Sequence, residues 1–143
     1  MKNPLFISIA LMAVLFTSCN KHDDAVVPVS TNTVNNTVVS GTWRITYFWD
    51  NDQDETANYS GYAFTFGGGA VLTAGNGTSS VTGTWTSGTD DSTVKLIISF
   101  STPSSFVDLS DDWHVLSRTD TKITLQDVSG GNGGTDFLTF EKN

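Results

Sequence analysis

Residues 81–86 read VTGTWT, and this stretch indicates the fold more clearly than any other part of the chain. Val81, Gly83 and Trp85 alternate with three threonines, so the two sets of side chains fall on opposite faces of an extended segment. β-Branched and aromatic residues also fit a half-buried pleated surface. The stretch therefore predicts a β-strand with one face in a core.

The same alternation continues from this strand in both directions. In residues 43–49, Trp43, Ile45, Tyr47 and Trp49 share one face, and Phe48 is expected on the other. No segment has a sustained helical period, and only residues 103–109 suggest a short helical turn. The expected strands are residues 43–49, 62–66, a short one at 72, 81–86, 94–100, 113–115, 123–125 and 138–140.

Eight successive strands with one apolar face each predict an all-β, up-and-down barrel, because closure removes exposed sheet edges. A β-sandwich of two sheets is the alternative that periodicity leaves open. Alternate loops share an end of a barrel, which predicts one closed end and one loop-rich mouth. The closed-end turns are 67–69, 87–93 and 119–121, and the longer mouth loops are 50–61, 74–80, 101–111 and 129–135.

Composition excludes several classes of protein. The chain has 143 residues with a net charge of −8, which suits one domain and disfavours binding to nucleic acid. Its one cysteine cannot form an intrachain disulfide, and its two histidines cannot form a His-rich metal site. His114 is the one histidine of the strand region, and no Gly-x-Ser-x-Gly elbow is present, so no enzyme is expected.

The N-terminus has the pattern of a secretory signal. Lys2 precedes an apolar run over residues 4–16, which is too short to span a bilayer. The run leads to Cys19, and residues 16–19 (FTSC) resemble a bacterial lipobox, with Phe16 in place of the usual Leu. The resemblance implies a signal peptide over residues 1–18 and lipidation of Cys19, and hence a membrane-lipid anchor. A free thiol after an ordinary signal peptide is the alternative.

The segment that follows Cys19 suggests both a localisation signal and a flexible linker. Residues 20–24 (NKHDD) resemble the signal that sends lipoproteins of the Bacteroidetes to the cell surface, which implies an outer-membrane, surface-exposed location. A solvated charge run is the alternative. Residues 25–40 lack periodic apolar spacing, which favours a flexible tether over residues 19–40 and a domain over residues 41–143.

The strand region resembles the lipocalins. Gly41-Thr42-Trp43 is similar to their Gly-x-Trp motif, and Thr119-Asp120 is similar to the start of their Thr-Asp-Tyr motif, with Thr121 in place of Tyr. The resemblance implies that Trp43 lies at the closed end under a cation, supplied by Arg118 or Lys142. The region most resembles short lipocalin-like domains of Bacteroidetes lipoproteins, although it lacks a C-terminal helix.

Two functions remain open from the sequence. In the first, the mouth admits a small apolar molecule that inward-facing aromatic residues bind. In the second, the barrel is solid, and its mouth loops, with exposed Phe48 and Trp49, bind a protein or a glycan. The residues expected to line a ligand cavity are Tyr47, Tyr62, Phe64, Trp85 and Trp113, and the alternative is that they only fill the core.

The mouth loops are acidic and contain no lysine or arginine. Asp50, Asp52 and Asp54 superficially resemble the opening of a calcium loop. Calcium is therefore the one cofactor that the sequence suggests, and no other is expected. The loop lacks the required Gly and the twelfth-position Glu, and an acidic rim that only aids solubility is the alternative. The negative potential disfavours anionic ligands such as fatty acids.

Overall fold

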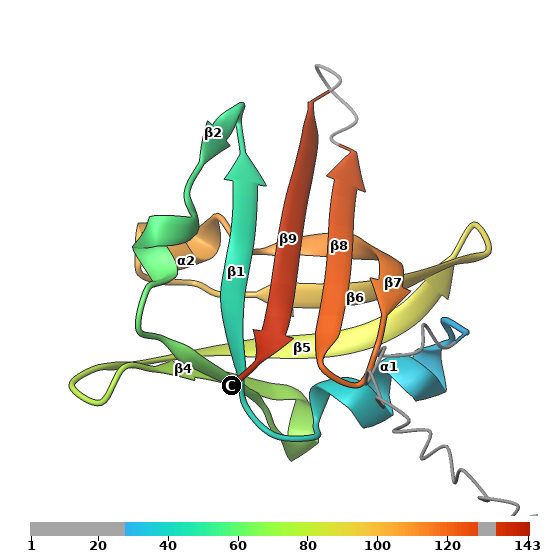
Figure 1. Ribbon diagram of the computed structural model, residues 1–143, viewed down its shortest axis with the longest axis horizontal. Helices are drawn as coiled ribbons and strands as arrows, with labels where there is room; N and C mark the ends of the chain where they lie inside the picture. Colours follow the sequence, from blue (N-terminus) through green and yellow to red (C-terminus); the bar gives the residue numbers. More distant parts are fainter. Residues whose placement is uncertain (1–27, 129–133) are drawn as a thin grey trace, which may run out of the picture.

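The structure is a closed, antiparallel barrel of eight main strands (Figure 1). It is a computed structural model, and it describes residues 28–128 and 134–143. The predicted signal peptide, Cys19 and residues 20–24 lie outside the described residues, as does most of the last mouth loop. The strands are β1 (Trp43–Asp50), β2 (Gln53–Asp54), β3 (Ala63–Phe66), β4 (Val71–Gly75), β5 (Ser80–Asp90), β6 (Thr93–Ser99), β7 (Asp111–Arg118), β8 (Lys122–Val128) and β9 (Thr135–Lys142).

Pairing of the first and last long strands closes the barrel. β9 pairs with β8 on one side and with β1 on the other, and the second pairing runs from Trp43 opposite Lys142 to Trp49 opposite Phe137. β1 also pairs with β3, through Trp43 and Phe64. The up-and-down barrel is thus confirmed over the sandwich, and the two-residue β2 is a short addition to the first mouth loop.

A β-bulge in β1 changes which of its side chains face the core. The register with β9 shifts between Ile45 and Tyr47, so the alternation reverses after that point. Phe48 is therefore fully buried, whereas Tyr47 is 39% exposed. The prediction that Tyr47 faces inward and Phe48 outward was wrong for this reason, because strict alternation assumes an unbroken ladder.

A second bulge has the same effect in β7. The register with β8 shifts between Val115 and Ser117, and the shift turns Arg118 inward, whereas strict alternation would place it on the outer face with the exposed Leu116. Arg118 is only 6% exposed. Both bulges lie where alternation in the sequence gives no warning of them.

A helix occupies part of the predicted tether, so that prediction was wrong for residues 31–38. α1 (Thr31–Val38) has Ser30 as its N-cap, and the Ser30 side chain accepts a hydrogen bond from the backbone N–H of Thr33 in a capping box. Val34 and Val38, one helical turn apart, are fully buried in the barrel core. The packed domain thus includes residues before Gly41, and α1 lies at the end of the barrel where β9 finishes (Figure 1).

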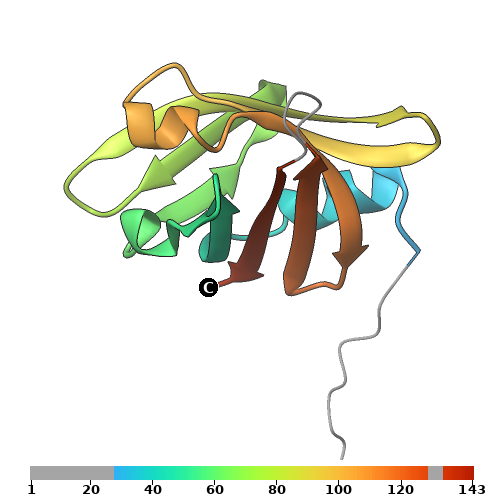
Figure 2. The ribbon, with the colours of Figure 1, turned by 90° about the horizontal axis from the view of Figure 1, so that it is seen from above.

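Short helical turns occupy the loops. η1 (Thr56–Tyr59) and α2 (Ser104–Val107) lie in mouth loops, and α2 confirms the turn expected in residues 103–109. η2 (Gly68–Ala70) lies in a closed-end loop. Figure 2 shows β5 and β6 as a long hairpin, which ends in a two-residue turn at Asp91 and Ser92 rather than in the longer loop predicted over residues 87–93.

Candidate functional site

Four of the five predicted ligand-lining residues belong to the packed core. Phe64, Trp85 and Trp113 are at most 9% exposed, and Tyr62 packs against the same cluster. Rings from opposite strands meet across the interior, as Phe48 of β1 and Trp113 of β7 do with ring centroids 6.3 Å apart. Tyr47, the fifth candidate, lies on the outside of the barrel.

The polar atoms of these aromatic residues are already bonded to the protein. The indole N–H of Trp113 donates to the carbonyl of Leu109 at 3.0 Å, and that of Trp85 to the carbonyl of Gly67 at 3.0 Å. The hydroxyl of Tyr62 lies 3.3 Å from that of Ser79. A ligand inside the barrel would have to break these bonds before it could use the same groups.

Two loop residues that complete the core were not predicted from the sequence. Tyr59 of η1 and Phe106 of α2 pack edge to face with ring centroids 5.5 Å apart, and Phe106 also contacts Phe64. The hydroxyl of Tyr59 donates to the carbonyl of Ser105, and burial raises the pKa of Tyr59. A lone aromatic in a mouth loop has no periodic partner, so periodicity could not identify these residues.

The closed end matches the arrangement that the lipocalin resemblance implied. Trp43 is fully buried, and its indole N–H donates to the carbonyl of Val38 in α1 at 2.8 Å. The ammonium of Lys142 lies 5.5 Å from the centre of the Trp43 ring, so Lys142 is the covering cation. Gly41 makes the turn into β1 with a φ of +94°, which favours glycine.

The turn from β7 to β8 completes this end. The Thr119 hydroxyl accepts hydrogen bonds from the backbone N–H groups of Thr121 and Lys122, at 3.2 and 3.0 Å. Arg118 does not cover Trp43; its guanidinium donates to the Thr37 hydroxyl and lies 3.9 Å from Asp120. The turn motif therefore supports the base of the barrel, and Arg118 joins it to α1.

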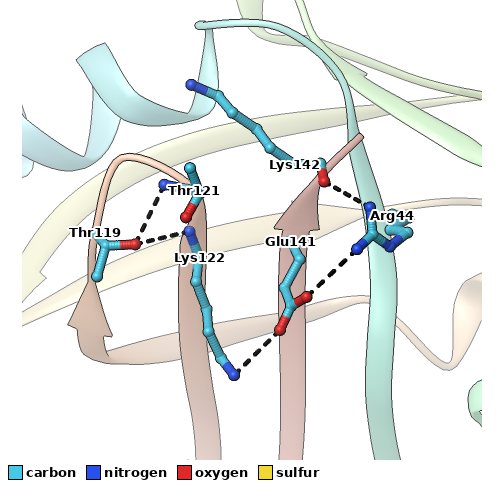
Figure 3. A pocket seen from close by; sticks show the side chains of 6 residues that line it. All are labelled: Arg44, Thr119, Thr121, Lys122, Glu141 and Lys142. Carbon is cyan, nitrogen blue, oxygen red and sulfur yellow. Dashed lines mark hydrogen bonds and ion pairs between the residues drawn. The ribbon is translucent and has the colours of Figure 1, made fainter. Parts of the chain in front are cut away.

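Figure 3 shows a surface hollow beside this turn. Glu141 lies between two cations there, at 3.5 Å from Arg44 and 3.1 Å from Lys122. Arg44 also donates to the backbone carbonyl of Lys142 at 2.6 Å. Arg44 and Lys122 thus share one carboxylate partner, whereas Lys142, the third cation of this hollow, has none among the described ion pairs. The hollow is lined by Arg44, Thr119, Thr121, Lys122, Glu141 and Lys142.

The mouth brings several carboxylates together. Burial raises the pKa of Asp50, and the nearby charges of Asp136, Glu55 and Asp108 raise it further. Asp54 differs from Asp50, because hydrogen bonds to its carboxylate from the Thr56 side chain and from the Thr56 backbone N–H, the latter at 3.0 Å, lower its pKa. The rim is therefore strongly negative, as the sequence indicated.

The predicted calcium triad does not form a single group. Asp50 and Asp54 flank the turn from β1 to β2, and Asp52 lies exposed in that turn. Among the described residues, three carboxylates that could reach one ion are instead those of Asp111, Asp112 and Asp127, whose oxygens lie within 4.8 Å of one another. Asp112 is also paired with Lys95, which lowers its pKa.

Charge is therefore divided between the two ends of the barrel. Five basic side chains lie in the described residues, and Arg44, Arg118, Lys122 and Lys142 are all at the closed end, with Asp120 and Glu141 as the acids beside them. The acids of the mouth have no basic residue in the described loops. The described basic residues are thus concentrated at the closed end, whereas the charged residues of the described mouth loops are all acidic.

Comparison with known proteins supports the fold alone. The chain matches no protein-family model and no curated protein. Among solved structures it is similar to a DUF4847 family protein from Bacteroides vulgatus, with 17% identity and a TM-score of 0.51 over 77% of this chain and 97% of that one. In the described part of the chain, no helix has the length and apolar character needed to cross a membrane.

Proposed function

We propose that the chain is a non-enzymatic lipoprotein of the outer membrane, held at the cell surface by acylated Cys19. The apolar run before Cys19, its small residues and the single cysteine support the anchor. Residues 20–24 support surface exposure through their resemblance to an export signal. In this proposal the barrel is carried outside the cell on a lipid anchor.

Replacing Cys19 with serine is expected to abolish acylation in a bacterial host, since a hydroxyl at this position does not form the thioether to lipid. The variant should leave the membrane fraction, whereas the parent should stay in it and incorporate labelled fatty acid. Fractionation and metabolic lipid labelling provide the measurement. Lipid label on the serine variant would contradict the proposed anchor.

The function that the geometry supports best is binding at the outer surface rather than in the barrel. The observation that carries this proposal is the packed aromatic core: the inward candidate residues pack against other buried rings, and the indole N–H groups of Trp85 and Trp113 are bonded to backbone carbonyls. The acidic mouth is then the surface available for recognition. Its charge favours a basic protein segment over an anionic or neutral partner.

A basic peptide tests this proposal. The full chain in uncharged detergent should bind an oligolysine peptide, bind no oligoglutamate, and lose affinity as salt is added. Asp50→Asn combined with Asp108→Asn should weaken oligolysine binding roughly threefold to tenfold, the range for two rim charges. Fluorescence anisotropy of the labelled peptide provides the measurement.

The matched control removes two acids from the turn between β5 and β6. Asp90→Asn combined with Asp91→Asn changes the net charge equally but leaves the mouth intact, so affinity should change by less than about twofold. Equal losses of oligolysine affinity in the two double variants would show that the net charge of the protein, and not the mouth, determines binding. A fatty acid that binds the parent and raises its melting temperature would contradict the filled interior and support the cavity function instead.

A further inference from the structure

A second hollow lies at the closed end, between α1 and the turn from β7 to β8. It has a volume of about 350 Å³ and is predominantly polar. Lys142 lines both this hollow and the one in Figure 3, so the two adjoin at this side chain. The residues that line it are Thr33, Asn36, Thr37, Ser40, Arg118, Asp120 and Lys142.

Arg118 is buried in this hollow with little countercharge. Its side chain is 8% exposed, and its Nε–H is buried without a hydrogen-bond acceptor. One nitrogen of its guanidinium donates to the neutral hydroxyl of Thr37. Among the described residues its one ion-pair partner is Asp120, whose carboxylate is 3.9 Å away on a side chain that is 86% exposed. A buried guanidinium is costly unless an anion neutralises it, and this partner does so weakly.

Lys142 supplies a second cation without an acidic partner among the described ion pairs. Its ammonium lies 3.4 Å from the hydroxyl of Ser40 and 5.5 Å from the centre of the Trp43 ring. Arg44 and Lys122, by contrast, share Glu141. Two incompletely neutralised cations thus converge on one polar hollow in a protein whose net charge is −8.

We propose that this hollow is a binding site for an oxyanion of the phosphate class. Arg118 and Lys142 provide the positive charge, and the Ser40 hydroxyl and Asn36 amide provide neutral hydrogen-bond donors. The bound anion supplies the countercharge that the Arg118 guanidinium lacks. The site is independent of the acidic mouth, which repels the same ligand.

The two arginines of the chain allow a direct test by NMR. The full chain, labelled with nitrogen-15 in uncharged detergent, is titrated with inorganic phosphate at constant ionic strength, with chloride as the balancing anion. The Nε–H signal of Arg118 should move and saturate, because this group senses the charge placed beside its guanidinium. The Nε–H signal of Arg44, which is paired with Glu141, should move far less.

Two variants and a control assign the site. Lys142→Gln should weaken phosphate binding on the order of tenfold, the usual effect of losing one charged hydrogen bond. Lys122→Gln removes the same charge from the same end but does not line this hollow, so affinity should stay within about twofold. Asp120→Asn removes the one carboxylate among the described residues that line this hollow and should tighten binding, while its exposed position keeps the fold unchanged.

A second titration distinguishes the source of the anion. Glycerophosphoglycerol is a soluble phosphodiester with the chemistry of a lipid headgroup. Saturation of the Arg118 signal by the diester at concentrations comparable to phosphate supports a headgroup as the ligand, and saturation by phosphate alone supports a free phosphate. Absence of saturation with both, or equal losses in Lys142→Gln and Lys122→Gln, would overturn the site.

Discussion

Replacing Trp43 with alanine is expected to lower the free energy of unfolding by about 3–5 kcal/mol, the cost of removing a large buried aromatic side chain. Trp43 is fully buried, and β1 pairs there with both β3 and β9. Its indole N–H also donates a hydrogen bond to the carbonyl of Val38 in α1. The alanine variant thus has a cavity where the barrel closes, and it lacks the hydrogen bond to the Val38 carbonyl of α1. Urea denaturation followed by circular dichroism measures the loss.

Lys142→Met provides the matched control for Trp43. Methionine keeps an aliphatic cover near the indole but removes the cation, so only about 0.5–1 kcal/mol should be lost, as for an exposed cation–π contact. A Trp43→Ala variant that unfolds at the urea concentration of the parent would show that the closed end does not depend on this residue. A loss in Lys142→Met as large as that in Trp43→Ala would assign the stability to the charge instead.

The strands and the closed end could be predicted because both leave local signals in the sequence. Val81, Gly83 and Trp85 alternate with threonines, and the structure places them in β5. The resemblance to the lipocalins correctly implied that Trp43 lies buried under a cation. Closure of the barrel followed from the number of one-faced strands, because an open sheet would leave two edges exposed.

Helix α1 could not be predicted from periodicity because its own residues favour a helix weakly. It consists of threonine, asparagine and valine, which have low helix propensity. Two features were available in the sequence: Ser30 at the N-cap, and Val34 and Val38 four residues apart. They suffice only with the barrel beneath them, since most helix stability in proteins comes from packing of the apolar face.

The candidate site was predicted in part. The acidic rim could be counted from the sequence, and the charges around Asp50 confirm that these loops meet. The positions of Tyr59 and Phe106 inside the barrel depend on how loops fold over the mouth, which no local pattern encodes. The inward turn of Arg118 depends on the bulge in β7, so the hollow that it lines could not be foreseen.

Alanine substitutions at two adjacent residues of β1 should lower the free energy of unfolding by amounts that differ by several kcal/mol. The larger loss should occur at the residue that strict alternation would place outside the barrel. Phe48→Ala is expected to cost about 3–5 kcal/mol, because its ring is fully buried and packs edge to face on Tyr59 and Trp113, at 5.5 and 6.3 Å. Tyr47→Ala should cost no more than about 1 kcal/mol, since Tyr47 lies outside the barrel and loses mainly its contacts with neighbouring strands.

The difference between these variants tests the β-bulge itself. Without the shift between Ile45 and Tyr47, Tyr47 would follow Trp43 and Ile45 into the core, and the costs would be reversed. Both variants are unfolded with denaturant at one protein concentration. A midpoint that falls while the slope of the unfolding free energy against denaturant stays equal to that of the parent indicates a loss of packing, and a changed slope indicates a change in the compactness of the native or denatured state. A greater loss of unfolding free energy in Tyr47→Ala than in Phe48→Ala would show that the alternation is unbroken and that Tyr47 faces the core.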